Sequence, residues 1–283
     1  ALATITWTSA SNDNSDATFT LVSTDGGTNA DTDTFAVTVT AINDEPSIAC
    51  TGGTPTFAED GAAQSLFSSC TVLAGGAGGD AESDDIASMV FTVTNVQDTS
   101  EIIAFDGTSI TLAASQSGST TGTQTGQGVT YSVAGCSNTC TVTLTAATGA
   151  VTLAELDAAV EAMTYSNSDQ SPTIGQTRVV TITTLTDEGS SSSPHDNSAT
   201  ESDAATVTLT KSNDLPTTGD QTKTILEDAT YTASSGDFTF ADVDGDSVSH
   251  IKITGLEDAG TLYYDNDGND AYTSGEDVTA NQE

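Results

Sequence analysis

Threonine alternates with β-branched and other apolar residues along much of this 283-residue chain, and this pattern restricts the fold more than any other feature. Each run places apolar side chains on one face of an extended segment and hydroxyls on the other, as half-buried antiparallel strands do. The runs cover residues 34–40, 89–93, 141–144, 179–183, 205–209 and 251–253. The pattern predicts an all-β fold built from antiparallel β-sandwiches.

One segment, residues 153–163, departs from this alternation and has helical spacing. Leu153, Leu156, Val160 and Met163 fall on one face of a helix. Thr152 precedes the segment, and a glutamate three residues later completes a capping box. We therefore expect one short helix in an otherwise all-β chain.

A second constraint is internal repetition. Residues 35–46 recur as residues 205–216, and both copies read as a strand followed by Asn-Asp-x-Pro. An acidic pair, an acidic run and a further strand follow each copy in the same order. The first set is Asn43, Asp44, Glu59, Asp60, Asp80, Glu82 and Asp84, and the second is Asn213, Asp214, Glu227, Asp228, Asp242, Asp244 and Asp246.

The repeated Asn-Asp-x-Pro motif indicates where modules meet. Proline cannot donate to a β-ladder and biases the preceding residue toward extended geometry, so Pro46 and Pro216 mark transitions between sandwiches. We therefore predict three parts: closing strands of one module in residues 1–43, a complete module in residues 44–213, and opening strands of another in residues 214–283.

The net charge limits the possible partners. The chain has 41 acidic and four basic residues, for a formal charge of −37. Nucleic acids and acidic membrane surfaces need a Lys/Arg footprint that this chain lacks. No run approaches the ~20 apolar residues of a membrane span, so we expect no membrane insertion. Divalent cations or a saline medium are the physical candidates for balancing the carboxylates.

The four cysteines favour an oxidised, extracellular protein. Cys136 and Cys140 flank a turn between two alternating runs, where a disulfide would clamp a hairpin. Cys50 and Cys70 would then close another loop. Zinc binding is the alternative, although the spacing shows no pair of Cys-x2-Cys knuckles. The connectivity stays open at this point.

Several motifs resemble those of a known group of proteins. They are the two Asn-Asp-x-Pro linkers, the stretch 240–246 with its Asp-x-Asp-Gly-Asp run, residues 260–264, and residues 156–165 with 172–182. Together they resemble the cadherin-like and immunoglobulin-like tandem repeats of giant bacterial surface proteins, including calcium-dependent adhesins of the RTX class. The resemblance implies β-sandwiches strung end to end, with calcium at the linkers, in secreted proteins. The cysteines and the Asp80-Ala-Glu82-Ser-Asp84 run depart from the usual family pattern.

The clearest candidate metal site lies near the end of the chain, in residues 265–276. Asp265, Asp267 and Asn269 offer side-chain oxygens at positions 1, 3 and 5, Ala271 offers a carbonyl at 7, and Glu276 stands at 12. This spacing matches the EF-hand loop and suits Ca²⁺, which takes six to eight oxygen ligands. The alternative is a solvated acidic turn, since position 6 is aspartate where an EF-hand has glycine.

The acidic residues of the two repeated sets form the second candidate. Carboxylates brought from separate loops to one end of a sandwich repel each other unless a cation lies among them. Calcium at Asn43 and Asp44 or Asn213 and Asp214, with the acidic pairs and runs that follow, is the functional interpretation. The alternative is that these residues are there because Asp and Asn favour turns.

No catalytic signature stands out. Ser193, His195 and Asp196 are the residue types of a triad, but adjacency along the chain cannot give triad geometry. We expect a non-enzymatic extracellular or cell-surface protein: a calcium-stiffened stalk, fibre or surface-layer component with adhesive function. A lectin-like module that binds cell-surface glycans is the alternative, with Trp7 and Tyr263-Tyr264 as possible sugar platforms.

The outer parts of the chain suggest its partners. Residues 1–43 and 214–283 each read as part of a sandwich, and an isolated half-sandwich leaves bare strand edges. Two explanations stay open. The chain is a window of a longer tandem array, or the tail of one copy completes the head of the next in a filament. Neighbouring modules or copies of the same protein are the expected partners in both cases.

Overall fold

The computed structural model describes residues 4–10, 13–75, 84–113, 115–147, 149–269 and 271–280. Contacts between Cα atoms divide the chain into two compact units, Ala1–Ser212 and Asn213–Glu283. The fold is all-β with a single α-helix among the described residues, as the sequence predicts.

All regular strands of the described residues belong to the first unit. The first eight are β1 Ala17–Thr24, β2 Ala30–Val37, β3 Ser47–Gly52, β4 Thr56–Ala58, β5 Gln64–Ser65, β6 Phe67–Leu73, β7 Ile86–Thr94 and β8 Glu101–Phe105. The others are β9 Thr108–Thr111, β10 Gln116–Ser119, β11 Val129–Ala134, β12 Thr139–Ala146, β13 Thr164–Asn167, β14 Arg178–Asp187, β15 Ser198–Thr200 and β16 Ala204–Thr210.

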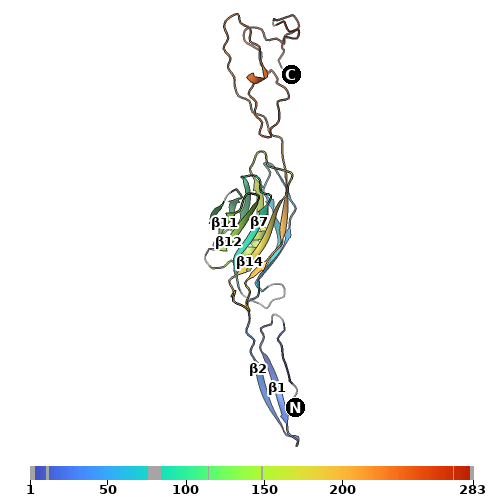
Figure 1. Ribbon diagram of the computed structural model, residues 1–283, viewed down its shortest axis with the longest axis vertical. Coiled ribbons are helices and arrows are strands. Elements are labelled where there is room, and N and C mark those ends of the chain that lie inside the picture. The colour runs from blue at the N-terminus through green and yellow to red at the C-terminus, as the bar shows by residue number, and fades with distance from the viewer. Residues whose placement is uncertain are drawn as a thin grey trace. The chain divides into compact units, whose positions relative to one another are not determined.

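These strands form two main sheets, and β7 lies at the centre of the larger one. The larger sheet has the order β10-β11-β12-β7-β14-β16-β4, with β15 paired to β14, and Figure 1 shows β11, β12, β7 and β14 side by side. Neighbours are antiparallel except β16 and β4, which are parallel. The smaller sheet has the order β5-β13-β8-β9, and β3 pairs separately with β6.

The core lies between the sheets and follows from the alternation in sequence. Phe91 of β7 is opposite Ile182 of β14, and both side chains are fully buried. Phe57 of β4 packs edge-on against Tyr165 of β13, with ring centroids 5.7 Å apart. Apolar residues of both sheets thus form one continuous cluster, as in a β-sandwich.

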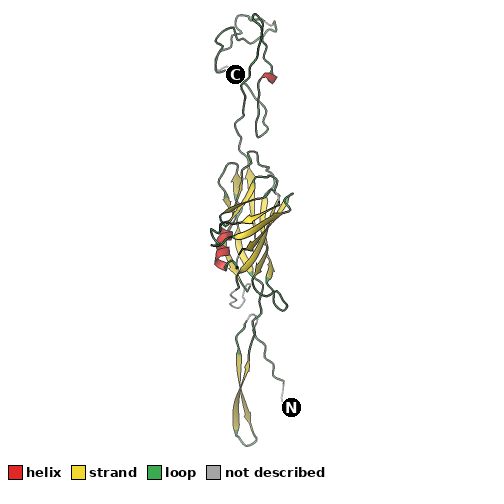
Figure 2. Ribbon diagram, turned by 90° about the vertical axis from the view of Figure 1, so that its left-hand side faces the viewer, coloured by secondary structure: helices red, strands yellow, loops and turns green. Residues whose placement is uncertain are grey.

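The predicted helix is confirmed as α1, Leu153–Glu161. Thr152 accepts a hydrogen bond from the Glu155 amide, and the Glu155 carboxylate accepts one from the Thr152 amide, which is the capping box expected from the sequence. Leu156 and Val160 are buried, and the helix packs beside β6 (Figure 2).

Both disulfides are present, in the pairing that the turn positions favoured. Cys50 of β3 is joined to Cys70 of β6, and Cys136 is joined to Cys140 at the turn between β11 and β12. The first bridge ties two paired strands and the second closes a hairpin turn. The described residues contain no free cysteine.

The β1–β2 hairpin carries an apolar face. Phe19 is opposite Phe35 in the ladder, with ring centroids 6.5 Å apart, and Trp7 packs edge-on against Phe19 at 6.0 Å. Leu21 lies on the same face because side chains alternate along a strand. Phe35 is nevertheless 56 % exposed, so large apolar side chains of this hairpin remain in contact with solvent.

The second unit contains no regular strand among its described residues. It has isolated bridges, Thr217 with Ala241 and Tyr263 with Asp277, and a short 3₁₀ helix, Ser235–Asp237. The strand predicted at residues 251–253 is therefore wrong as a strand, because only Ile253 has bridge geometry. A β-strand needs a hydrogen-bonded neighbour, and within this unit that segment has no continuous ladder.

A buried aspartate organises the loop after β8. The Asp106 carboxylate accepts hydrogen bonds from the hydroxyls of Thr120 and Thr125 and from the amides of Gln124 and Thr125. Burial by itself raises the pKa of Asp106, but these hydrogen bonds outweigh it and hold the pKa below the ordinary 3.8. Asp106 is therefore ionised, and its carboxylate holds residues 120–125 in place through these hydrogen bonds.

We expect Asp106 to contribute to acid denaturation. Because its folded pKa lies below its unfolded pKa, the carboxylate stabilises the fold above the unfolded pKa, and that stability is lost as pH falls through the folded pKa. Asp106→Asn should therefore be less stable than wild type at neutral pH, and its stability should decline less below the ordinary pKa of 3.8. Urea denaturation as a function of pH measures both. Equal slopes for the two proteins in acid would contradict this role.

Candidate cation sites

The loop at residues 265–276 brings three carboxylates together, as the EF-hand spacing predicted. One oxygen each of Asp265, Asp267 and Glu276 lie within 4.8 Å of one another, and among the described residues this is the only such group of His, Cys, Asp or Glu. Asp265 and Asp267 are exposed, whereas Glu276 is only 6 % exposed. Three carboxylates at this separation repel one another and favour a bound cation.

Backbone geometry preorganises this loop. Asp265 Oδ1 accepts hydrogen bonds from the amides of Gly268 at 2.7 Å and Asn269 at 3.0 Å. The two Glu276 oxygens accept from Asn266 N at 2.9 Å and Thr273 N at 2.8 Å. These bonds fold the chain back so that position 12 meets positions 1 and 3.

The other predicted ligands of this loop lie beside the three carboxylates. The Asn269 side chain donates to Asp267 Oδ2 at 2.9 Å, and the Ala271 amide donates to Asn269 Oδ1 at 2.7 Å. Asn269 thus lies within the turn, and Ala271 is two residues further along the chain. Oxygen ligands from carboxylates, an amide and the backbone are the set that Ca²⁺ prefers.

A second group of acidic residues lies around the end of β14. Asp187 closes this strand and is 1 % exposed, and its Oδ1 accepts a hydrogen bond from Gly189 N at 2.7 Å. Asn43 Nδ2 donates to Asp187 Oδ1 at 3.3 Å and to the Asp196 carbonyl at 2.6 Å. We call Asn43, Asp84, Asp187 and Asp196 the Asp187 cluster.

The Asp187 cluster contains oxygens without hydrogen bonds. Asp187 Oδ2 and Asn43 Oδ1 are both buried and have no hydrogen-bond partner among the described residues. Burial raises the pKa of Asp187, the Asp84 and Asp196 charges raise it further, and the hydrogen bonds from Gly189 and Asn43 oppose this. An unpartnered buried carboxylate is unfavourable, and a cation nearby would relieve it.

Close packing fixes Asn43 in this cluster. A Cβ atom at Gly189 would lie 1.8 Å from Asn43 Oδ1, so only glycine fits here. The Asn43 amide donates to His195 Nδ1 at 2.8 Å, and the Asp196 amide donates to the Asn43 carbonyl at 2.9 Å. His195 and Asp196, two of the three triad residue types noted in the sequence, therefore hold Asn43 in place.

The remaining predicted ligands of the first unit lie elsewhere or outside the described residues. Asp80 and Glu82 lie outside the described part of the chain. Asp44 is partly buried next to Asn43. Glu59 is buried beside Ser212, whose amide donates to Glu59 Oε2 at 2.7 Å, and its Oε1 accepts no hydrogen bond from a described residue. Asp60 accepts a hydrogen bond from Gln170 at 2.8 Å.

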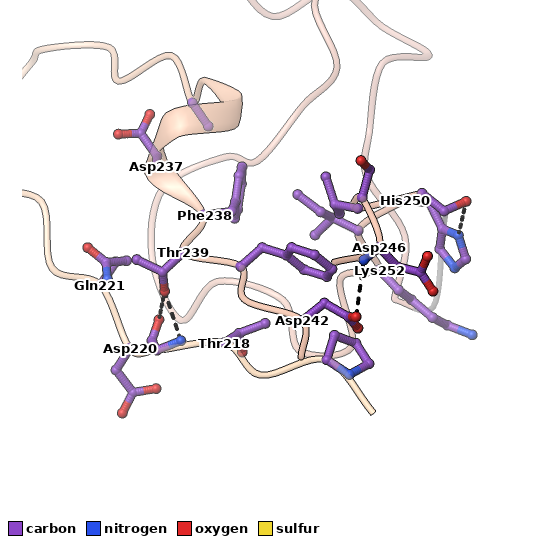
Figure 3. A pocket seen from close by; sticks show the side chains of 18 of the residues that line it. Thr218, Asp220, Gln221, Asp237, Phe238, Thr239, Asp242, Asp246, His250 and Lys252 are labelled. Atoms are coloured by element: carbon purple, nitrogen blue, oxygen red, sulfur yellow. Dashed lines mark hydrogen bonds between the residues drawn. The ribbon is translucent and has the colours of Figure 1, made fainter. Parts of the chain in front are cut away.

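In the second unit, the acidic run folds around Asp242. Asp242 Oδ1 accepts from Asp244 N at 3.0 Å and Asp246 N at 3.1 Å, and Figure 3 shows Asp242 and Asp246 close together. Asp244 Oδ2 accepts from Asp214 N at 2.9 Å. Two carboxylate oxygens, Asp214 Oδ2 and Asp244 Oδ1, are buried and have no hydrogen-bond partner among the described residues.

The other predicted ligands of the second unit are in contact with solvent. Glu227 and Asp228 are exposed on a turn where Asp228 has a φ of 62°. Asn213 is also exposed, and its side chain donates to the Asp214 carbonyl at 3.0 Å. Within this unit, the structure therefore brings Asp214 into contact with the acidic run and leaves the pair Glu227-Asp228 at the surface.

Known proteins provide no comparison for the candidate cation sites. In the described part of the chain, no helix is both long and apolar enough to cross a membrane. The acidic groups described above are the candidate functional sites of the two units. Comparison of the chain with protein-family models, with curated proteins and with solved structures found no match.

Proposed function

We propose that this chain is a non-enzymatic extracellular structural protein in which calcium ions stiffen β-sandwich modules. It acts as a stalk, fibre or surface-layer component, in the manner of the tandem-repeat adhesins that its motifs resemble. Its partners are neighbouring modules or copies of the same protein. The observation that carries the proposal is the convergence of Asp265, Asp267 and Glu276 within 4.8 Å.

The ligand chemistry supports calcium over other metals. The groups that converge are carboxylates and amides, which are hard oxygen ligands, whereas zinc prefers histidine and cysteine. All four cysteines are in disulfides and so do not offer thiolates. His195 already accepts a hydrogen bond through Nδ1. Calcium is therefore the cation that these groups suit best.

Charge and redox state support an extracellular structural role. A formal charge of −37 opposes compaction by self-repulsion, and each bound calcium would offset two of these charges. Disulfides persist in oxidising compartments such as the cell exterior. A calcium-rich, saline exterior satisfies both requirements at once.

We expect calcium to raise the melting temperature of the full chain. At a free calcium concentration of about 100 times Kd, mass action stabilises the native state by about 2.7 kcal/mol, or about 5 to 10 °C for a domain of this size. Sodium at equal ionic strength should change the melting temperature much less, because screening does not depend on a specific site. Differential scanning calorimetry in calcium, in sodium and in EDTA measures the difference.

Two variants localise this effect in the first unit. Asp187→Asn removes the buried carboxylate of the Asp187 cluster and should reduce the calcium-dependent shift of the transition of the first unit. Asp31→Asn removes an exposed charge from β2 and should leave the shift unchanged. A melting temperature of the wild type that is indifferent to EDTA would argue against calcium stiffening.

A further inference from the structure

The β1–β2 hairpin has an exposed apolar face that matches the internal repeat. It precedes Asn43-Asp44 as β14–β16 precede Asn213-Asp214. Both copies also share an Asp-x-Gly in which the glycine amide donates to the aspartate: Gly27 N donates to Asp25 Oδ1 at 2.8 Å, and Gly189 N donates to Asp187 Oδ1 at 2.7 Å. The β1–β2 hairpin is thus a second copy of the strands that close the sandwich.

The second unit is a second copy of the opening segments of the sandwich. Asp228 has a φ of 62° and Asp60 a φ of 57°, so the two acidic pairs form the same left-handed turn. Each turn is closed by a backbone hydrogen bond from the next residue, Gly61 N to Ala58 O at 2.8 Å and Ala229 N to Leu226 O at 3.3 Å. The repeat seen in sequence is therefore also a repeat of local structure.

The corresponding core positions differ in burial. Counting from the acidic runs, Val248 and Ile251 correspond to Ile86 and Met89 of β7. Ile86 and Met89 are each 2 % exposed, whereas Val248 is 49 % and Ile251 is 41 % exposed. In the first unit, β14 and β12 flank β7 in the same sheet. Phe105 of β8 and Leu156 of α1 lie against Ile86 and Met89. The described residues of the second unit include these core residues but no strands that flank them.

A groove of about 880 Å³ marks this uncovered region in the second unit. Tyr231, Phe238, Phe240, Val248 and Ile251 supply its apolar lining, and Phe238 is labelled among the lining residues in Figure 3. Asn213 and Asp246 also line it. A groove of this size with an apolar lining suits a partner with an apolar face.

We propose that the β1–β2 hairpin of one copy of this chain docks in the groove of the second unit of another copy. The first unit contains the template, because β14 pairs with β7 and β16 pairs with β4. The hairpin is the repeat of β14 and β16, and the second unit carries the repeat of β4 and β7. By this template, Phe19, Leu21 and Phe35 lie beside Val248 and Ile251 on one face of a shared sheet. Donation of strands to an open sandwich is a known form of β-augmentation.

The same correspondence brings one more acidic residue to the groove. In the first unit, Asp187 contacts Asn43 and lies near enough to Asp84 for its pKa to be raised. The equivalents are Asp25 on the hairpin and Asn213 and Asp246 in the groove lining. Docking therefore assembles a second Asp187-type cluster from two copies. Because the hairpin and the groove are different surfaces, the contact is head-to-tail and propagates into a filament.

Sedimentation velocity of the full chain tests this proposal. We expect the mass in calcium-containing buffer to rise above 28.5 kDa with concentration, through a series of oligomers. Phe35→Asp on the hairpin and Ile251→Asp in the groove should each weaken association at least about 30-fold, because each places a charge at the centre of the interface. Val22→Asp, on the opposite face of the hairpin, is the matched control and should assemble like the wild type.

Mixing the two variants distinguishes head-to-tail docking from other contacts. Phe35→Asp keeps an intact groove and Ile251→Asp keeps an intact hairpin, so an equimolar mixture should form dimers and no larger species. Circular dichroism and the melting transition of the first unit verify that both variants are folded. A wild-type chain that stays monomeric at high concentration would overturn the proposal and point instead to neighbouring modules of a longer chain. Association of Phe35→Asp alone or of Ile251→Asp alone with the affinity of the wild type would also overturn the proposal.

Discussion

Replacing Arg178 with methionine should lower the free energy of unfolding of the first unit by about 3 to 5 kcal/mol. Arg178 begins β14 and is fully buried. Its Nη2 lies 2.8 Å from Glu101 Oε1 and its Nε lies 3.0 Å from Glu101 Oε2. Without the guanidinium, the Glu101 carboxylate would remain buried without a counter-charge, which is the costly way to break such a pair.

The surrounding hydrogen bonds explain why this ion pair is tolerated in the core. Tyr165 donates its hydroxyl to Glu101 Oε2 at 2.9 Å, and the amides of Gln97 and Asp98 donate to Oε1. Burial raises the pKa of the Tyr165 hydroxyl, and the adjacent Glu101 charge raises it further, so the tyrosine stays a donor. The network is fully satisfied, and removal of one member leaves several groups without partners.

Two variants calibrate the Arg178 prediction. Lys211→Met removes an exposed cation whose Nζ donates to Ser171 Oγ at 2.6 Å, and it should change stability by less than about 0.5 kcal/mol. Adding Glu101→Gln to Arg178→Met should recover part of the loss, because it removes the orphaned charge. Urea denaturation followed by near-ultraviolet circular dichroism measures all three. A loss below about 1 kcal/mol for Arg178→Met would show that the pair adds little to stability.

The double variant Cys50→Ser/Cys70→Ser should be the next most destabilised, by about 3 kcal/mol. The bridge joins residues 20 apart in sequence, and the stabilisation by a cross-link in the chain-entropy account grows with the loop it closes. Loss of the Cys136–Cys140 bridge, which spans only four residues, should cost about 1 kcal/mol less.

Denaturant midpoints of the two double-serine variants measure this difference directly. Both variants remove one disulfide and add two hydroxyls, so each serves as the chemical control for the other. Equal losses, or a larger loss for the Cys136 and Cys140 variant, would contradict the loop-length explanation. Under reducing conditions, the wild type and the two double-serine variants should share a common lower stability.

Features encoded locally could be predicted from the sequence. The capping box of Thr152 and Glu155 defined α1, because a helix start depends on residues within one turn. Alternation predicted β7, β14 and β16, since a strand with one buried face carries period two in its own sequence. The convergence of Asp265, Asp267 and Glu276 was also predictable, because these residues come from one continuous segment.

Features assembled from distant segments could not be predicted this way. Asp187 and Asn43 are 144 residues apart, and only the fold brings them together. The repeated Asp-x-Gly of residues 25–27 and 187–189 is the signal that could have identified Asp187. The Arg178–Glu101 pair was missed for the same reason, although a cation inside an alternating strand is rare in a chain with four basic residues. At residues 251–253 alternation is present, but only Ile253 has bridge geometry in the described part of the second unit.

Isothermal titration of the full chain with calcium tests the proposed function most directly. We expect saturable calcium binding by the wild type, and loss of one class of sites when Asp265→Asn and Glu276→Gln are combined. The control combines Asp31→Asn with Asp258→Asn. It removes an equal number of charges from exposed positions and should bind calcium like the wild type. Calcium binding that is unchanged by the Asp265 and Glu276 substitutions, or absent from the wild type, would contradict the account.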